Sequence, residues 1–262
     1  MLQSPHFLGY TFSWYWLLLS AAIIISLGVF FMLEKRKPSN GVLWQKLAIV
    51  YGMIIVGFIF GRVFSLAEYF IGLKHFPSLS EFLLQFRTWT GSRWYGALTA
   101  GFLFLELARI IFRKAQINWG QYLSNIATAV CLGIAIGKIG CFLDGHTGCG
   151  GMATGLPWGV HYPYGTAVSN IPLHPVQIYD FIAYTSIFLV LLHYHRKGNA
   201  DVYRLFFLAV SIYNIPVEFV ISNTVFVTGH LSFGQYVYMF LGIVAAIPLI
   251  LKLYRKRYVS LG

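Results

Sequence analysis

The chain alternates between long apolar stretches and short polar connections. Seven of the apolar stretches are about as long as the 20 or so residues that carry an α-helix across a bilayer. They cover residues 11–32, 47–68, 92–112, 120–140, 175–194, 203–222 and 234–254. The first has no charged residue, no basic start and no small-residue cleavage site, so we expect a retained helix and not a signal peptide. The pattern therefore predicts an all-α integral membrane protein with seven transmembrane helices.

Composition agrees with this pattern and excludes several classes of protein. Apolar residues make up 58% of the 262 positions and charged residues 10%, and the mean hydropathy is +0.68. Ordinary soluble domains carry about 25% charged residues. A soluble enzyme, a disordered regulator and a nucleic-acid-binding module are therefore excluded. We expect residues 1–262 to form a single polytopic membrane domain, with residues 139–174 as a long outer-face loop within it.

The basic residues are distributed unevenly between the two ends of the predicted helices. The net charge is +11, and 14 of the 19 Lys and Arg residues fall in alternate connections. These are Lys35, Arg36, Lys37, Lys46, Arg109, Arg113, Lys114, Arg196, Lys197, Arg204, Lys252, Arg255, Lys256 and Arg257. Because cytoplasmic loops are enriched in Lys and Arg, we expect this side to be cytoplasmic. The N-terminus is then outside and the C-terminus cytoplasmic.

Several ionisable residues interrupt the apolar stretches at a similar depth. They are Arg62, Glu68, Lys138, Asp180 and Glu218, all in the outward half of the predicted bundle. A charge in the bilayer core costs about 3 kcal/mol unless it is paired or hydrated. Each of these residues could snorkel or pair locally, but five at one depth favour a polar cavity open to the outer leaflet. Glu106 lies toward the other end and is expected to pair with Arg109, one turn later.

The loop 139–174 and its first flank hold the densest group of reactive side chains. Glycines recur around its start, so backbone amides could cradle an anion beside Lys138, although the same glycines could simply allow close helix packing or a tight turn. Cys141, His146 and Cys149 could ligate zinc, but C-x4-H-x2-C matches no standard zinc spacing. A Cys141–Cys149 disulfide competes with that interpretation, since the loop is expected to face an oxidising compartment. We therefore expect no metal and no cofactor.

Two histidines and an arginine are further candidates for chemistry. His146 and His174 could act as general bases, because an unperturbed pKa of about 6.5 suits proton abstraction near neutral pH. Either could equally be a loop histidine that hydrogen-bonds a backbone carbonyl. Arg93 precedes Trp94 and Tyr95 at an expected outer helix end. Aromatic residues are common at membrane interfaces, but a guanidinium can bind a phosphate through two hydrogen bonds.

The order of these motifs resembles that of the bacterial prolipoprotein diacylglyceryl transferases. Residues 137–146, G-K-I-G-C-F-L-D-G-H, are similar to the family signature G-R-h-G-N-F-h-N-G-E, in which h is apolar. Residues 174–180, H-P-V-Q-I-Y-D, are similar to H-P-[ST]-Q-L-Y-E. Further similarities lie at residues 13–15, 61–62, 94–98, 213–219 and 234–235. The resemblance covers nearly the whole chain, which is identified as a divergent member of this family.

The resemblance implies a membrane transferase that moves a diacylglyceryl group from phosphatidylglycerol to the cysteine of an exported prolipoprotein. It implies a multi-pass protein of the bacterial cytoplasmic (inner) membrane, whose partners are the phospholipid phosphatidylglycerol, the prolipoprotein signal segment and the membrane, and which binds no nucleic acid. By position it suggests catalytic roles for His146, Tyr95 and Lys138. The implied substrate- and phosphate-binding residues are Lys138, Arg93, Arg62, Tyr15, Cys141, Asp144, His174, Gln177, Tyr179, Asp180, Asn214 and Glu218.

The chain departs from the family pattern at positions expected to carry the chemistry. Tyr95 stands where the family has a histidine, and Lys138 and Asn214 stand where it has arginines. Cys141 and His146 replace an asparagine and a glutamate. A lysine keeps the positive charge of an arginine but loses its planar fork of donors, and a tyrosine is a poor base at neutral pH.

These departures leave two interpretations of function. In the first, Arg93 and Arg62 supply the missing cation and His146 the missing base, and the transfer reaction is kept. In the second, the chain is a divergent paralogue that uses another acceptor, or that only binds lipid or lipoprotein. A secondary transporter would need polar residues through the whole membrane thickness and ideally an internal repeat, and the sequence shows neither.

Overall fold

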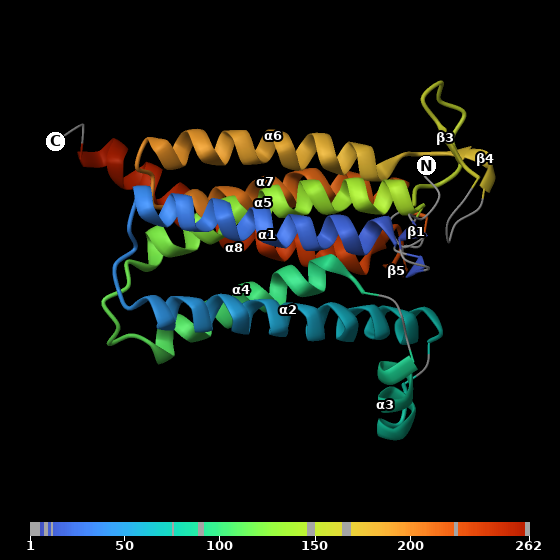
Figure 1. Ribbon diagram of the computed structural model, residues 1–262, viewed down its shortest axis with the longest axis horizontal. Helices are drawn as coiled ribbons and strands as arrows, with labels where there is room; N and C mark the ends of the chain where they lie inside the picture. Colours follow the sequence, from blue (N-terminus) through green and yellow to red (C-terminus); the bar gives the residue numbers. More distant parts are fainter. Residues whose placement is uncertain are drawn as a thin grey trace. The chain divides into compact units, whose positions relative to one another are not determined.

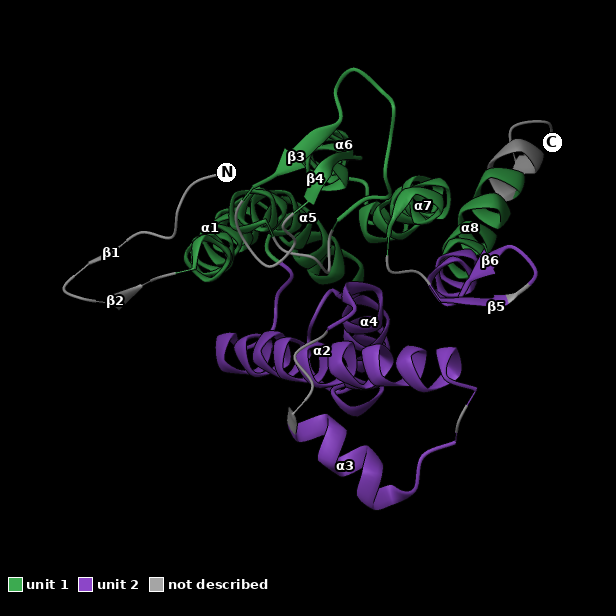
Figure 2. Cartoon of the chain, turned by 90° about the vertical axis from the view of Figure 1, so that its right-hand side faces the viewer, with its two compact units in different colours: residues 1–38, 120–223, 242–262 green, residues 39–119, 224–241 purple. Residues whose placement is uncertain are grey.

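The computed structural model describes residues 6–7, 10–11, 13–74, 76–88, 92–145, 150–163, 169–222 and 225–259. The chain divides into two compact units, which Figure 2 shows in green and purple. Unit 1 consists of residues 1–38, 120–223 and 242–262, and unit 2 of residues 39–119 and 224–241. Both units are built mainly of helices. Near the N-terminus, the two-residue strands β1 (His6–Phe7) and β2 (Tyr10–Thr11) pair antiparallel.

Seven helices in the described part of the chain are long and apolar enough to cross a membrane, as the hydrophobic pattern predicts. They are α1 (Trp14–Arg36), α2 (Leu43–Gly72), α4 (Trp94–Ile111), α5 (Trp119–Asp144), α6 (Val176–Arg196), α7 (Val202–Val217) with its 3-10 extension η2 (Glu218–Val220), and α8 (Phe233–Val259). Three of them, α2, α5 and α8, are several residues longer than predicted. α2 begins at Leu43 and ends at Gly72, and α5 continues to Asp144, so residues 139–144 are helical and do not belong to the loop that was expected over residues 139–174. Hydropathy marks only the part of a helix that lies in hydrocarbon, whereas the helix itself can continue into the polar interface.

Gly140 explains why α5 continues through glycines that could also have marked a loop. A Cβ at this position would lie 3.1 Å from the Leu18 Cβ and 3.4 Å from the Tyr15 Cα, both on α1. The glycine therefore lets the α5 backbone approach α1 closely. This packing offsets the roughly 1 kcal/mol that glycine costs in a helix relative to alanine. Of the two structural roles considered for these glycines, Gly140 serves close helix packing.

In unit 1, α1, α5, α6 and α7 run alongside one another (Figure 1). The helix α5 supplies much of the interior of this unit, including the fully buried Tyr122, Asn125 and Cys131. The connection from α5 to α6 carries an antiparallel hairpin of β3 (Val160–Tyr162) and β4 (Ser169–Leu173). In this hairpin Val160 pairs with Leu173 and Tyr162 with Ser169, around a register shift.

The helices of both units expose apolar side chains and bury polar ones. Ile24 on α1 and Phe58 on α2 are 70% and 66% exposed, whereas Asn125 on α5 and Asp180 on α6 are almost fully buried. This is the reverse of the usual distribution in a soluble protein. It suits a surface in contact with lipid, where polar groups must find their partners inside the protein.

In unit 2, α2 packs along α4. A Cβ on Gly96 of α4 would lie 2.5 Å from the Phe64 Cβ of α2, so glycine is needed for this approach. Glu106 and Arg109 form the local ion pair expected from the sequence, with 3.3 Å between carboxylate and guanidinium. The strands β5 (Phe226–Thr228) and β6 (Leu231–Ser232) form a short antiparallel pair just before α8.

The hydrophobic pattern does not predict the short helix α3 (Leu79–Thr88). Its ten residues cannot span a bilayer, and its Leu79 and Leu83 are exposed. Its apolar residues recur every three or four positions, which is the amphipathic spacing of an interfacial helix. The Arg62 Nε of α2 donates a hydrogen bond of 2.6 Å to the Phe86 carbonyl, and the guanidinium lies over the Phe86 ring. Arg62 therefore fastens α3 to α2.

Candidate functional site: two polar clusters

Polar side chains proposed from the sequence, together with Tyr213, which was not proposed, form two clusters, one within each unit. The Lys138 cluster consists of Lys138, Asp180 and Tyr213 in unit 1. The Glu68 cluster consists of Glu68, Arg93 and Tyr95 in unit 2. Each is centred on one buried carboxylate that accepts hydrogen bonds from a cation and from a tyrosine.

The Lys138 cluster joins three helices. Lys138 lies near the end of α5, and its Nζ is 2.5 Å from the Asp180 Oδ2 at the start of α6. The Tyr213 hydroxyl of α7 donates to the Asp180 Oδ1 at 2.7 Å, so both oxygens of the carboxylate are engaged. The Lys138 side chain is 14% exposed and the Asp180 side chain 4%. The ammonium is therefore the member of this ion pair that a ligand can reach.

Asn214 supports this cluster through a tyrosine. Its Nδ2 donates to the Tyr184 hydroxyl at 2.8 Å and to the Val210 carbonyl at 2.7 Å. The Tyr184 ring meets the Tyr213 ring edge-on, with 5.8 Å between centroids. At a position where the family resemblance leads us to expect an arginine, this chain thus has a buried neutral amide that orients the aromatic neighbours of Asp180.

Gln177 offers a buried hydrogen-bond donor one turn before Asp180 on the same face of α6. The residue is fully buried, and its Oε1 accepts a hydrogen bond of 2.9 Å from the Tyr162 hydroxyl of β3. Its Nε2 has no hydrogen-bond partner among the described residues. A buried donor left unsatisfied costs about 1–3 kcal/mol. An acceptor on a ligand, such as a phosphate or ester oxygen, would remove that cost.

His174 is engaged by neighbours, while the other candidate base lies outside the described residues. The Tyr179 hydroxyl accepts a hydrogen bond from the Trp158 Nε1 at 2.8 Å and lies 3.3 Å from the His174 Nδ1. Since a hydroxyl can donate one hydrogen bond and accept two, the contact between Tyr179 and His174 can form with the proton on either residue. His146 and Cys149 fall outside the described residues, so neither that base nor the proposed disulfide is placed.

Four other predicted ligands lie in or beside helices of unit 1. Tyr15 is in the first turn of α1, where its backbone meets α5 at Gly140. Cys141 is buried within α5, and Asp144, the last residue of that helix, is partly exposed. Glu218 is buried at the first position of η2. Their roles as substrate ligands stay predictions.

The Glu68 cluster links α2 to the start of α4. Arg93, the residue before α4, forms an ion pair through its Nε with the Glu68 Oε2, and the Tyr95 hydroxyl donates to the same oxygen at 3.0 Å. The Val225 backbone N–H donates to the Glu68 Oε1 at 3.3 Å. The Arg93 side chain is 21% exposed and that of Glu68 3%. The Tyr95 hydroxyl uses its proton to bind a carboxylate, so in this arrangement it is a donor and not a base.

The residues that sequence reasoning missed are partners of the predicted site residues. Tyr162 and Tyr184 were not proposed, although they contact Gln177 and Asn214. One signal was available on α6, where Gln177, Asp180 and Tyr184 follow a three-four spacing that places them on one helix face. For Tyr162, on a strand far away in sequence from its partner, no local signal exists.

Each cluster, considered by itself, has side chains that could neutralise an anion. Lys138 and Arg93 are partly exposed cations, each held by a buried carboxylate, and Gln177 has a spare donor. Cations and fixed donors of this kind stabilise negative charge that develops on a phosphate leaving group. Donors of this kind are suited to binding a phosphate group.

Comparison with known proteins agrees with this chemistry. A family model described as prolipoprotein diacylglyceryl transferase matches residues 5–251. A protein of Cupriavidus necator named phosphatidylglycerol--prolipoprotein diacylglyceryl transferase is 30% identical over 254 residues, which is 93% of this chain and 89% of that protein. A protein of Clostridium tetani with the same name is 30% identical over 245 residues, which is 89% of this chain and 93% of that protein. In the segment that matches the family signature, Lys138 lies against the buried Asp180 carboxylate. A family match of this extent shows that the chain belongs to the prolipoprotein diacylglyceryl transferase family.

Proposed function

We propose that this chain transfers a diacylglyceryl group from phosphatidylglycerol to the cysteine thiol of an exported prolipoprotein. The support is the family match over residues 5–251 together with the relatives that carry this activity in their names. The observation that carries the proposal for this chain is the Lys138–Asp180 ion pair, because it keeps a partly exposed cation at the position of the family signature.

In the proposed reaction, the cysteine sulfur attacks the glyceryl carbon that is bonded to the phosphate oxygen. A carbon–sulfur bond forms, the carbon–oxygen bond to phosphate breaks, and glycerol phosphate leaves with that electron pair. Lys138 binds the phosphate and stabilises the charge that grows on the leaving oxygen. Gln177 donates a second hydrogen bond to the lipid, and Asp180 positions Lys138. His146 accepts the thiol proton.

The membrane placement that accompanies this proposal follows the distribution of charge. The N-terminus lies outside and the C-terminus in the cytoplasm of a bacterial inner membrane, because the Lys- and Arg-rich connections stay inside. The end of α5 and the start of α6 then face the exported substrate. The signal segment of the prolipoprotein approaches from the membrane, as the lipid donor does.

The test combines purified protein, phosphatidylglycerol labelled in its acyl chains and a peptide with a lipoprotein signal cysteine. We expect a thioether product, a loss of at least 100-fold in kcat for Lys138→Gln, and partial activity for Lys138→Arg, which restores the charge. Lys35→Gln, which removes an exposed lysine near the end of α1, is the matched control and should act like the wild type.

Three outcomes would contradict the proposal or one of its assigned roles. Full turnover by Lys138→Gln would remove this lysine from the mechanism. Binding of labelled lipid by folded wild-type protein without any thioether product would favour the paralogue that binds without catalysis. A His146→Gln variant that keeps full kcat would assign the proton transfer to another group.

A further inference from the structure

Unit 1 contains a cavity far from the Lys138 cluster. Its volume is about 830 Å³, and it lies between the first turns of α7, the later turns of α8 and the connection from α6 to α7. Lys197, in that connection, follows Asp180 by 17 residues along α6, which corresponds to about 25 Å of helix. The volume falls within the roughly 300–1,000 Å³ of typical small-molecule sites. This cavity is therefore large enough for a ligand and is separate from the proposed catalytic site.

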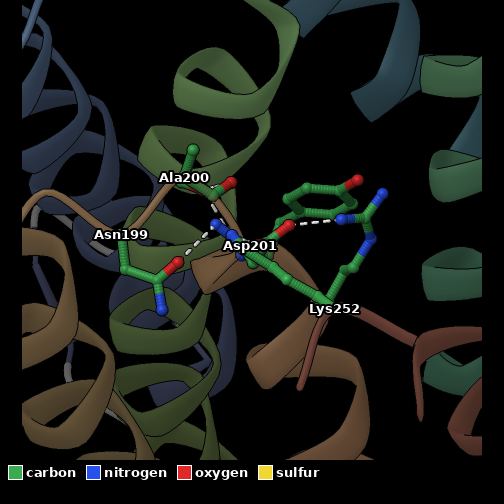
Figure 3. A network of polar contacts seen from close by, with 7 residues as sticks. Asn199, Ala200, Asp201 and Lys252 are labelled. Carbon is green, nitrogen blue, oxygen red and sulfur yellow. Dashed lines mark hydrogen bonds and ion pairs between the residues drawn. The ribbon is translucent and has the colours of Figure 1, made fainter. Parts of the chain in front are cut away.

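The wall formed by the connection is polar and held in place by several contacts. Asp201 forms ion pairs with Arg204 of α7 and Lys252 of α8, and its backbone N–H donates to the Asn199 Oδ1 at 2.9 Å (Figure 3). The Ser124 hydroxyl of α5 donates to the carbonyl of the neighbouring Ala200 at 3.0 Å. These contacts fix the rim of the cavity before any ligand binds.

The charge on this rim favours an anion. Burial raises the pKa of Asp201, but the hydrogen bond from Lys252 and the charges of Arg204 and Lys252 outweigh this effect and hold the pKa below its ordinary value. The carboxylate therefore stays ionised at neutral pH, and of its two cationic partners Lys252 lines the cavity, whereas Arg204 does not. Lys197, also on the cavity wall, is exposed and adds a further positive charge.

The remaining wall is apolar and begins directly below the rim. Leu205 and Leu208 of α7 face the cavity together with Ala246 and Leu249 of α8. Leu205 and Leu208 lie three and six residues into α7, which places them about 5 and 9 Å along the helix from its start. The cavity thus changes from basic to apolar over the distance at which a lipid headgroup gives way to its acyl chain. A soluble anion would use only the rim.

We propose that this cavity binds an anionic glycerophospholipid from the leaflet at the basic end of unit 1, with the phosphate at Lys197 and Lys252 and one acyl chain between α7 and α8. Basic pockets between transmembrane helices recognise anionic headgroups in this way. The bound lipid is not the donor of the transfer reaction, since it sits at the opposite end of α6 from Asp180.

Native mass spectrometry of the full chain, stripped of lipid in detergent, tests this proposal. The probe is dioleoyl phosphatidic acid, which carries no glycerol headgroup, and dioleoyl phosphatidylcholine with the same chains is the neutral comparison. We expect wild-type protein to retain phosphatidic acid in preference to phosphatidylcholine. Lys197→Gln should weaken binding about fivefold, the effect of one lysine near an anionic lipid surface, and Ala246→Trp should weaken it at least tenfold by filling the apolar wall.

Matched variants on the same elements separate this site from general effects. Arg196→Gln removes the exposed neighbour of Lys197, and Ile247→Trp adds an indole at an exposed position next to Ala246, and neither residue lines the cavity. Both should bind phosphatidic acid like the wild type, as should Lys138→Gln. Transferase turnover of Ala246→Trp, or its unfolding midpoint, shows that it is folded.

Three results would overturn the proposal. Equal losses in Ala246→Trp and Ile247→Trp would remove the acyl-chain site. Binding of inorganic phosphate that competes fully with phosphatidic acid would make the rim a site for soluble anions. A loss of phosphatidic acid binding in Lys138→Gln alone would assign the lipid to the proposed catalytic site, while leaving the transfer reaction itself intact as a proposal.

Discussion

Replacing Asp180 by asparagine tests whether the buried carboxylate holds Lys138 in place. Asparagine keeps the volume and one oxygen, so the hydrogen bond from Tyr213 can persist and the loss falls on the ion pair with Lys138. A hydrogen bond to a charged group contributes about 1.5–3 kcal/mol, and removal of one partner from a fully buried pair costs about 3–5 kcal/mol. Because the Lys138 side chain is 14% exposed, water can partly solvate the ammonium that the substitution leaves without its carboxylate partner. We therefore expect a loss of about 2–3 kcal/mol in the free energy of unfolding.

A double-mutant cycle isolates this interaction. The variants Asp180→Asn, Lys138→Gln and their combination are unfolded with a denaturing detergent and followed by tryptophan fluorescence. The double variant should be more stable than the sum of the single losses predicts, with a coupling energy of about 2 kcal/mol, because it leaves no unpaired charge. A coupling energy below about 0.5 kcal/mol would refute the reasoning. In turnover assays Asp180→Asn should lower kcat, since the phosphate-binding ammonium is no longer positioned.

Three further predictions concern other parts of the structure. Glu68→Gln should lower the free energy of unfolding by about 3 kcal/mol, because an amide donor would then face the Arg93 guanidinium; an unchanged unfolding curve would contradict the assigned ion pair. Gly140→Val should lower the free energy of unfolding by about 1–3 kcal/mol, because the new side chain overpacks against α1. Gly137→Val is the control, since a Cβ at that position meets nothing within 4 Å and should not lower the thermal midpoint through overpacking. Equal thermal midpoints for the two variants would reject the packing argument. The lowered pKa of Asp201 in the folded state contributes stability that is fully present above its unfolded pKa of about 3.9 and is lost as the pH falls through the folded value. The difference in thermal midpoint between wild type and Asp201→Asn should therefore shrink below about pH 4. Parallel pH profiles of the two midpoints would refute this contribution of Asp201.

The transmembrane helices were predictable because their signal is local. Each apolar stretch long enough to cross a bilayer can be read without knowing what it packs against, and all seven stretches correspond to helices. What hydropathy could not give was the polar continuation of α5 to Asp144. Helicity at Gly140 depends on contact with Leu18, more than a hundred residues earlier in the chain. The helix α3 was missed because its ten residues are amphipathic and too short to span a membrane.

The candidate site was predictable in its charges and not in its pairings. Lys138 and Asp180 were proposed as site residues because a charge in an apolar stretch is conspicuous, and the structure joins them. The sequence could not predict that Glu68 binds both Arg93 and Tyr95, because these contacts depend on how α2 packs against α4. The expectation that Arg62 replaces a phosphate-binding arginine stays a prediction, although its guanidinium is engaged with α3.

Unit 1 is drawn from three separate stretches of chain, and this imposes an order on biogenesis. The helix α1 is synthesised first, but the glycine-bearing surface of α5 that receives it follows only after α2, α3 and α4 have been made. A ribosome that stalls before residue 119 therefore leaves α1 inserted in lipid without its packing surface. Such truncated products expose an unassembled helix to membrane proteases, and a rearranged chain in which α1 directly precedes α5 should mature with less degradation.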